Sequence, residues 1–226
     1  ILLKKFGGKK VEEITNYDVQ QLHHELRETA YMANRVRALL HKMFNLAIQW
    51  QWVIANPVSG VKKYQEYKRD RWLNDEELQR LHDALDCYYN QSVANAIRLL
   101  VLTGARKNEV LSAAWNQFDL EKGVWVKLAH STKQKKMEHL PLSTQVLSLL
   151  KKMTEKATTK YLFPGKNPEK PIQDIKKAWC TISKNANLEK VRIHDLRHTH
   201  ASHLVSSGLS LSIVGKLLGH TQASTT

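Results

Sequence analysis

Only one stretch of this sequence is rich in residues that favour β-strands, and it is short: Val124–Leu128 reads VWVKL. Branched and aromatic side chains fit the pleated surface of a sheet, so a strand is favoured here. The polar run His130–Lys136 predicts a turn, Met137–Leu142 a partner strand, and Trp115–Leu120 a third strand. A chain of 226 residues with so little β-pattern is expected to be mainly α-helical, with one small antiparallel β-sheet.

Apolar residues at helical spacing occupy most of the remaining sequence. Asn56-Pro57 predicts the end of one long helix, because proline disfavours helical geometry in the residue before it. Thr15 or Asn16 has the position of a helix N-cap, and Gly104 has that of a helix C-cap. The ranges expected to be helical are Thr15–Arg27, Thr29–Val53, Asn74–Tyr88, Ser92–Thr103, Asn108–Ala114, Thr144–Lys156, Pro171–Asn185, Ile193–Ser207 and Leu211–Leu218.

A polar segment divides these helices into two groups. Residues 61–71 read VKKYQEYKRDR, which is highly charged and poor in large aliphatic side chains. We interpret it as a linker between a small helical unit, residues 1–60, and a larger mixed domain, residues 72–226. Its basic side chains would suit a strap across a nucleic-acid backbone, although a solvated hinge explains the composition equally well.

Charge and composition limit the class of partner. The net charge is +14, with 42% hydrophobic and 25% charged residues. Such a surplus in a globular composition favours a nucleic-acid partner over a merely solvated basic surface. No apolar run is long enough to cross a bilayer, and no signal peptide is evident. Cys87 and Cys180 form no metal-binding motif and are expected to be buried or free thiols in a reducing, cytoplasmic compartment. The first residue is Ile1 rather than Met, so we expect a fragment or the ordered part of a longer chain.

The histidine-rich stretch Ile193–Leu204, IHDLRHTHASHL, allows two interpretations. His194 and Arg197 are one helical turn apart, so one helix face offers an imidazole and a permanent cation to a phosphodiester. Alternatively, His194 and His198 have the spacing of a zinc-binding helix. Asp195 stands where such a motif has glutamate, and Arg197 would repel a cation. Phosphate binding is therefore favoured, without metal or cofactor, and His198, His200 and His203 are expected to be capping or core-lining groups.

Three other residues are candidates for the same chemistry. Arg106 opens a predicted helix, where its guanidinium could bind an anion, although most such arginines are surface residues or pair with an acid such as Glu109. Lys133 lies at the tip of the predicted β-turn, and His220 follows Gly219 at a helix end. Two arginines, a lysine and two histidines together indicate metal-free phosphoryl transfer.

Six segments, in order and spacing, resemble the tyrosine recombinase or phage integrase family. TGARKNEVLSAAW is similar to the box around the family's first arginine, HDLRHTHASHLVSSG to the second box and LLGHTQASTT to its continuation. STKQKKMEHLPL resembles the hairpin with the family lysine. NPVSGVKK and RWLNDEEL resemble the junction between the core-binding and catalytic domains. The resemblance covers nearly the whole chain.

The resemblance implies a site-specific recombinase that cleaves and rejoins DNA through a 3′-phosphotyrosyl intermediate. Arg106 and Arg197 would clamp the scissile phosphate, Lys133 would protonate the leaving 5′ oxygen, and His194 and His220 would assist proton transfer. The family's tyrosine nucleophile would lie beyond Thr226, because no tyrosine follows His220.

The family also implies double-stranded DNA as partner, a homotetramer on DNA, a monomer or weak oligomer when free, and DNA-bending accessory proteins. A mobile-element role is favoured over a housekeeping one. The alternatives are a DNA-binding fragment without catalysis and a strand-relaxing enzyme similar to type IB topoisomerases.

Overall fold

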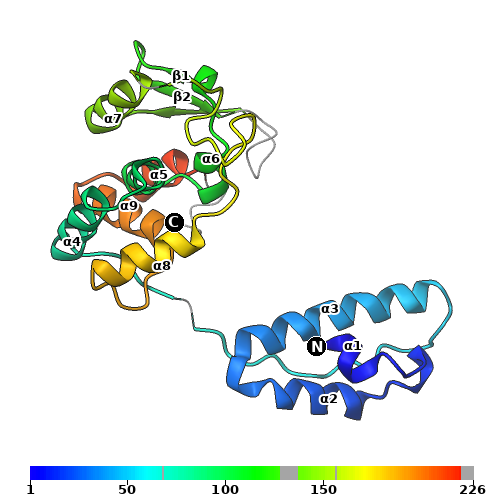
Figure 1. The fold of residues 1–226 in the computed structure, drawn as a ribbon. Helices are drawn as coiled ribbons and strands as arrows, with labels where there is room; N and C mark the ends of the chain where they lie inside the picture. The colour runs from blue at the N-terminus through cyan, green and yellow to red at the C-terminus, as the bar shows by residue number, and fades with distance from the viewer. Residues whose placement is uncertain (68, 128–136, 156, 220–226) are drawn as a thin grey trace. The chain divides into compact units, whose positions relative to one another are not determined.

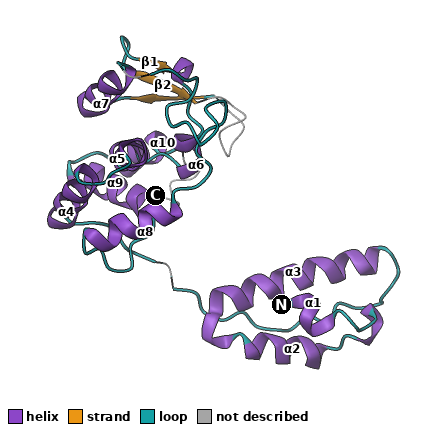
Figure 2. Cartoon of the chain, in the orientation of Figure 1, coloured by secondary structure: helices purple, strands orange, loops and turns teal. Residues whose placement is uncertain are grey.

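The computed structural model describes residues 1–67, 69–127, 137–155 and 157–219. The chain forms two compact units, Ile1–Arg69 and Asp70–Thr226. The fold is mainly α-helical with one three-stranded antiparallel sheet, which confirms the predicted fold class (Figures 1 and 2). Within the described ranges, no helix has both the length and the apolar character needed to cross a membrane.

The described residues of the first unit form three α-helices, α1 (Leu2–Phe6), α2 (Asn16–Glu25) and α3 (Ala30–Gln49), and two short 3-10 helices. Thr15 caps α2 as predicted, since its hydroxyl accepts a hydrogen bond from the backbone N–H of Asp18. The core contains apolar side chains of all three helices and of the chain after α3. The helix α3 ends at Gln49 rather than at the predicted Val53, because Gln51 has a φ of 59°, outside helical geometry.

The segment after α3 is fastened to this unit by Asn34. The Asn34 side chain donates to the backbone carbonyl of Tyr64 (2.8 Å) and accepts from its N–H (2.9 Å). The Tyr64 ring stacks on His23 with 4.3 Å between ring centroids, and Val61 is buried. The first part of the predicted linker therefore has defined contacts with the helical unit instead of being wholly solvated.

The second unit is arranged around α5 (Gln91–Thr103), which is apolar nearly all round, as its sequence predicts. It contacts four other helices. The helices of this unit are α4 (Asp75–Asp86), α5, α6 (Lys107–Leu111), α7 (Thr144–Thr154), α8 (Lys176–Asn185), α9 (Asp195–Ser206) and α10 (Leu211–Leu217).

The strands lie within the three segments predicted to be strands, but Trp115–Gln117, the first half of one of them, is a 3-10 helix. The strands are β1 (Phe118–Asp119), β2 (Val124–Lys127) and β3 (Glu138–Pro141), in the order β1-β2-β3. Trp125 is opposite Leu140, and Lys127 is opposite Glu138. Because side chains alternate along a strand, Trp125 and Lys127 share one face of β2, and both are buried.

Besides α3, two predicted helices differ from the structure by three residues or more at one end. The helix α8 begins at Lys176 rather than Pro171, because the chain before it is extended: Pro171 forms an isolated bridge with Pro164, and Ile172 donates to the Phe163 carbonyl (2.9 Å). The helix α6 ends at Leu111 rather than Ala114, which instead forms a bridge with Tyr161. Cys87 and Cys180 are free and exposed, so of the two states expected for them the buried one is wrong.

Candidate functional site

Arg106 is fixed in a sharp turn between two helices. Gly104 ends α5 in the left-handed conformation with a φ of 60°, and Arg106 is the N-cap residue of α6. The Glu109 carboxylate accepts from the backbone N–H of Arg106 (3.2 Å) and from its Nη1 (2.7 Å). One acidic side chain therefore caps the helix and orients the guanidinium, which retains 25% exposure.

Arg197 comes from the first turns of α9 and is buried, with 6% exposure. Its Nη1 donates to the Gly104 carbonyl (2.8 Å), and its Nη2 donates to the carbonyl of Leu218. Burial and the positive charge of Arg106 lower the pKa of Arg197 to about 10, against the opposing effect of Glu109 and Glu138. The guanidinium is therefore still protonated at neutral pH.

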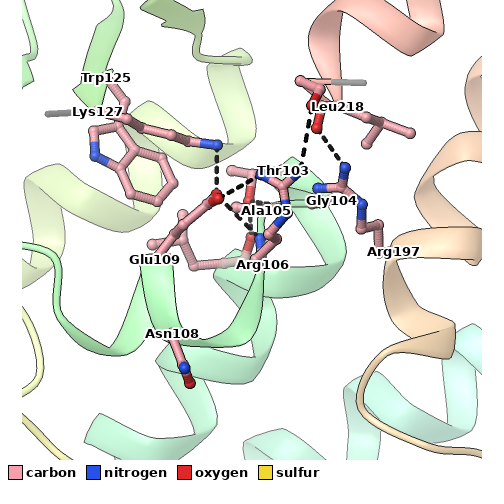
Figure 3. A network of polar contacts seen from close by, with 12 residues as sticks. Thr103, Gly104, Ala105, Arg106, Asn108, Glu109, Trp125, Lys127, Arg197 and Leu218 are labelled. Carbon is pink, nitrogen blue, oxygen red and sulfur yellow. Dashed lines mark hydrogen bonds and ion pairs between the residues drawn. The ribbon is translucent and has the colours of Figure 1, made fainter. Parts of the chain in front are cut away.

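The two arginines meet at the end of α10. The Nη2 of Arg106 donates to the carbonyl of Gly219 (3.2 Å), while Arg197 bonds the carbonyl of the preceding residue, Leu218. Figure 3 shows both guanidinium groups converging on this turn from different elements. Paired guanidinium groups present several N–H donors in fixed directions, which suits the non-bridging oxygens of a phosphate.

His194 lies beside this pair. It is the N-cap residue of α9, and its exposed ring contacts His198 edge to face, with 5.3 Å between centroids. Partial burial lowers the pKa of His194, and the charges of His198, Arg197 and Arg106 lower it further against the effect of Asp195. A neutral imidazole at pH 7 can donate or accept a proton. A cavity of about 790 Å³ is lined by Arg106, His194 and Arg197 among other residues.

The remaining sequence candidates divide into two groups. Lys133 and His220 lie outside the described residues, so their predicted positions stay predictions. His200 packs against Gly104: a Cβ atom added to the glycine would lie 2.7 Å from the imidazole Cδ2. The Nε2 atom of His203 lies 3.9 Å from Oδ1 of Asp75. In the described part of the chain, no three His, Cys, Asp or Glu side chains are grouped so that they could hold a metal ion.

A buried ion pair next to Arg106 was not predicted. The Nζ of Lys127 donates to Oε2 of Glu109 (2.9 Å), and each side chain is 3% exposed. Burial by itself raises the pKa of the Glu109 carboxyl, but Lys127 and the bonds from Arg106 outweigh it, so the net pKa is lowered. The signal in the sequence was the alternation in Val124–Lys127, which places a lysine on the same strand face as a buried tryptophan.

Comparison with known proteins identifies the relatives of the chain. The sequence profile of the phage integrase family matches residues 71–226. The chain is 28% identical over 171 residues to the prophage integrase IntZ of Escherichia coli, covering 74% of this chain and 42% of that protein. It is 27% identical over 236 residues to a tyrosine recombinase of Thermosipho africanus, covering 98% of this chain and 81% of the relative.

Among solved structures, a lambda integrase dimer bound to a COC′ core site has the same fold. The TM-score is 0.81 at 19% identity, with 96% of this chain and 82% of that chain covered. The chain spans about half the length of two of the integrases that it matches, at 42% and 46% of their lengths.

Proposed function

Because the chain belongs to the phage integrase family, we propose that it is part of a site-specific DNA recombinase that cleaves and rejoins duplex DNA through a 3′-phosphotyrosyl intermediate. The observation that carries this proposal is the meeting of Arg106 and Arg197 at the adjacent carbonyls of Leu218 and Gly219. The net charge of +14 supports a polyanionic substrate.

In this proposal each site residue has one role. Arg106 and Arg197 bind the non-bridging oxygens of the scissile phosphate and stabilise the charge that develops there. His194 and His220 assist proton transfer, and Lys133 protonates the leaving 5′ oxygen. The attacking tyrosine is expected after Thr226. The bond energy is retained in the phosphotyrosyl link, so strand exchange uses neither a metal ion nor another cofactor.

The division of the chain into two compact units supports a two-domain assignment. We assign residues 1–60 to the C-terminal part of a helical core-binding domain, residues 61–71 to a linker, and residues 72–226 to a catalytic domain. The protein acts in the cytoplasm as a homotetramer on double-stranded DNA, is a monomer or weak oligomer when free, and is assisted by DNA-bending proteins.

A trapped covalent complex tests this function. The chain, expressed with whatever its gene encodes beyond Thr226, is used to select its binding site from random DNA. A nicked suicide substrate with that site should then give a protein–DNA adduct that survives denaturation and forms equally well in EDTA. No adduct, or cleavage that EDTA abolishes, refutes the mechanism. Specific binding without an adduct favours a non-catalytic DNA-binding protein, and relaxation of supercoils without recombination favours a topoisomerase.

A further inference from the structure

Lys127 is a buried cation that the proposed mechanism does not use. Its side chain is 3% exposed, so it has no path to a bound substrate. The Nζ lies 4.8 Å from the centroid of the Trp125 ring, which is itself buried and donates through Nε1 to Gln117 (3.3 Å). The position of the lysine is therefore fixed by its strand and by the contact of its ammonium group with the Trp125 ring.

The only described route from Lys127 to the phosphate pocket runs through Glu109. The Oε2 of Glu109 accepts from Lys127 (2.9 Å) and from the Arg106 backbone (3.2 Å), so only Oε1 accepts from the Arg106 guanidinium (2.7 Å). A carboxylate that is otherwise unoccupied can take both terminal nitrogens of an arginine. The Oε2 atom has two acceptor positions, and Lys127 together with the backbone N–H of Arg106 fills both, so no position is left for a second bond from the guanidinium (Figure 3).

Charge leads to the same conclusion. Arg106, Arg197 and Lys127 are cationic, while Glu109 and the carboxylate of Glu138, which lies against Gly219, are anionic. Without Lys127, Glu109 would either form a two-bond pair with Arg106 or become protonated. A two-bond pair would turn the Arg106 guanidinium towards Glu109. Protonation of Glu109 would weaken the hydrogen bond that orients this guanidinium.

We propose that Lys127 is a positioning residue of the phosphate pocket, which holds one oxygen of Glu109 so that Arg106 keeps a single bond to that carboxylate and its remaining donors face the scissile phosphate. This inference rests on the recombinase function proposed above. In this inference Lys127 acts on the reaction through Glu109 and Arg106.

Three substitutions test it in single-turnover cleavage of the suicide substrate at saturating protein. Lys127→Met should lower the cleavage rate constant about 10- to 100-fold, with the dissociation constant for DNA changed by less than about 3-fold. Lys127→Arg keeps the charge and should restore most of the rate. Lys122→Met is the matched control, because Lys122 is a lysine of the same sheet region with 81% exposure, and its rate should equal the unsubstituted one.

Two further measurements separate positioning from a merely structural role. A substrate with a neutral methylphosphonate at the scissile position has less charge to stabilise, so the defect of Lys127→Met should shrink on it. Lys127→Met should also add little to Glu109→Gln, because the two residues act in one chain of contacts. This comparison also serves if Lys127→Met alone does not fold, since the double variant removes both charges of the buried Lys127–Glu109 pair.

Each result has a definite meaning. If the unsubstituted protein forms no adduct, both the recombinase function and this inference fall. If it forms the adduct but Lys127→Met cleaves normally, only the inference falls. The inference also falls if the losses from Lys127→Met and Glu109→Gln add independently, or if the defect is the same on both substrates.

Discussion

Replacing Gly104 by alanine should destabilise the second unit in two separable ways. Gly104 has a φ of 60°, which an L-residue adopts at a cost of about 1–2 kcal/mol. In addition, the new Cβ would lie 2.7 Å from both the Cδ2 of His200 and the Cδ2 of Leu218, closer than real Cβ contacts. Forced overpacking of this kind costs about 1–3 kcal/mol. The expected total is about 2–5 kcal/mol, a large share of the stability of a single domain.

Gly208→Ala is the matched control. Gly208 also follows a helix and has a φ of 90°, but no atom lies within 4 Å of its added Cβ. It should therefore lose about 1–2 kcal/mol from conformation alone. Equilibrium urea unfolding, followed by tryptophan fluorescence, measures both variants. Trp125 and Trp179 are buried in this unit, whereas Trp50 and Trp52 of the other unit are exposed, so the signal reports mainly the unit that is changed.

The difference between the two variants decides the outcome. Gly104→Ala should be less stable than Gly208→Ala by about 1–3 kcal/mol, which is the contribution of the contacts with His200 and Leu218. If both variants lose the same free energy of unfolding, the contact between α5, α9 and α10 at Gly104 is not as tight as the structure indicates.

Three other results are expected. Arg197→Ala should abolish covalent DNA cleavage yet weaken binding in a gel-shift assay less than about tenfold, because most affinity comes from other phosphate contacts. An equal loss of cleavage and of binding would contradict the proposed role of Arg197 at the scissile phosphate. The pKa of the Glu109 carboxyl is lowered from 4.5, so its ion pairs stabilise the fold above that pH. This stabilisation is lost as the pH falls through the lowered pKa. In Glu109→Gln, the free energy of unfolding should therefore fall less steeply as the pH is lowered through this range. Asn34→Ala removes the acceptor of the Tyr64 N–H, so it should lower the free energy of unfolding by about 1–3 kcal/mol and speed hydrogen exchange at that amide. Unchanged exchange at Tyr64 would show that Asn34 does not hold the segment after α3.

Local sequence signals predicted the elements well where one mechanism dominates. The cap at Thr15 and the glycine stop at Gly104 each constrain their own backbone. The stop predicted from Asn56-Pro57 was wrong, because α3 already ends at Gln49. Predictions failed where partners distant in sequence decide. The extended chain before α8 is held by residues 163–165, and α6 is short because Ala114 pairs with Tyr161. Periodicity contains no information about such partners.

The site shows the same division. Arg106 and Arg197 could be identified from their motifs, and Glu109 was foreseen as a partner of Arg106. The other acceptors could not be predicted, because they are main-chain carbonyls of Gly104, Leu218 and Gly219. The burial of Lys127 was also missed. A lysine in a strand is usually solvated, and only its shared face with Trp125 indicated burial.

These main-chain acceptors have a consequence for how such a site evolves. A carbonyl oxygen is present at every position, so replacing the side chain of Leu218 need not remove the acceptor that receives Arg197. What must be inherited is the path of the backbone, together with the few residues that fix it, such as Gly104. The surrounding side chains can then change widely while the carbonyl acceptors of the two guanidinium groups remain in place. A fold can likewise be retained at 19% identity, with a TM-score of 0.81.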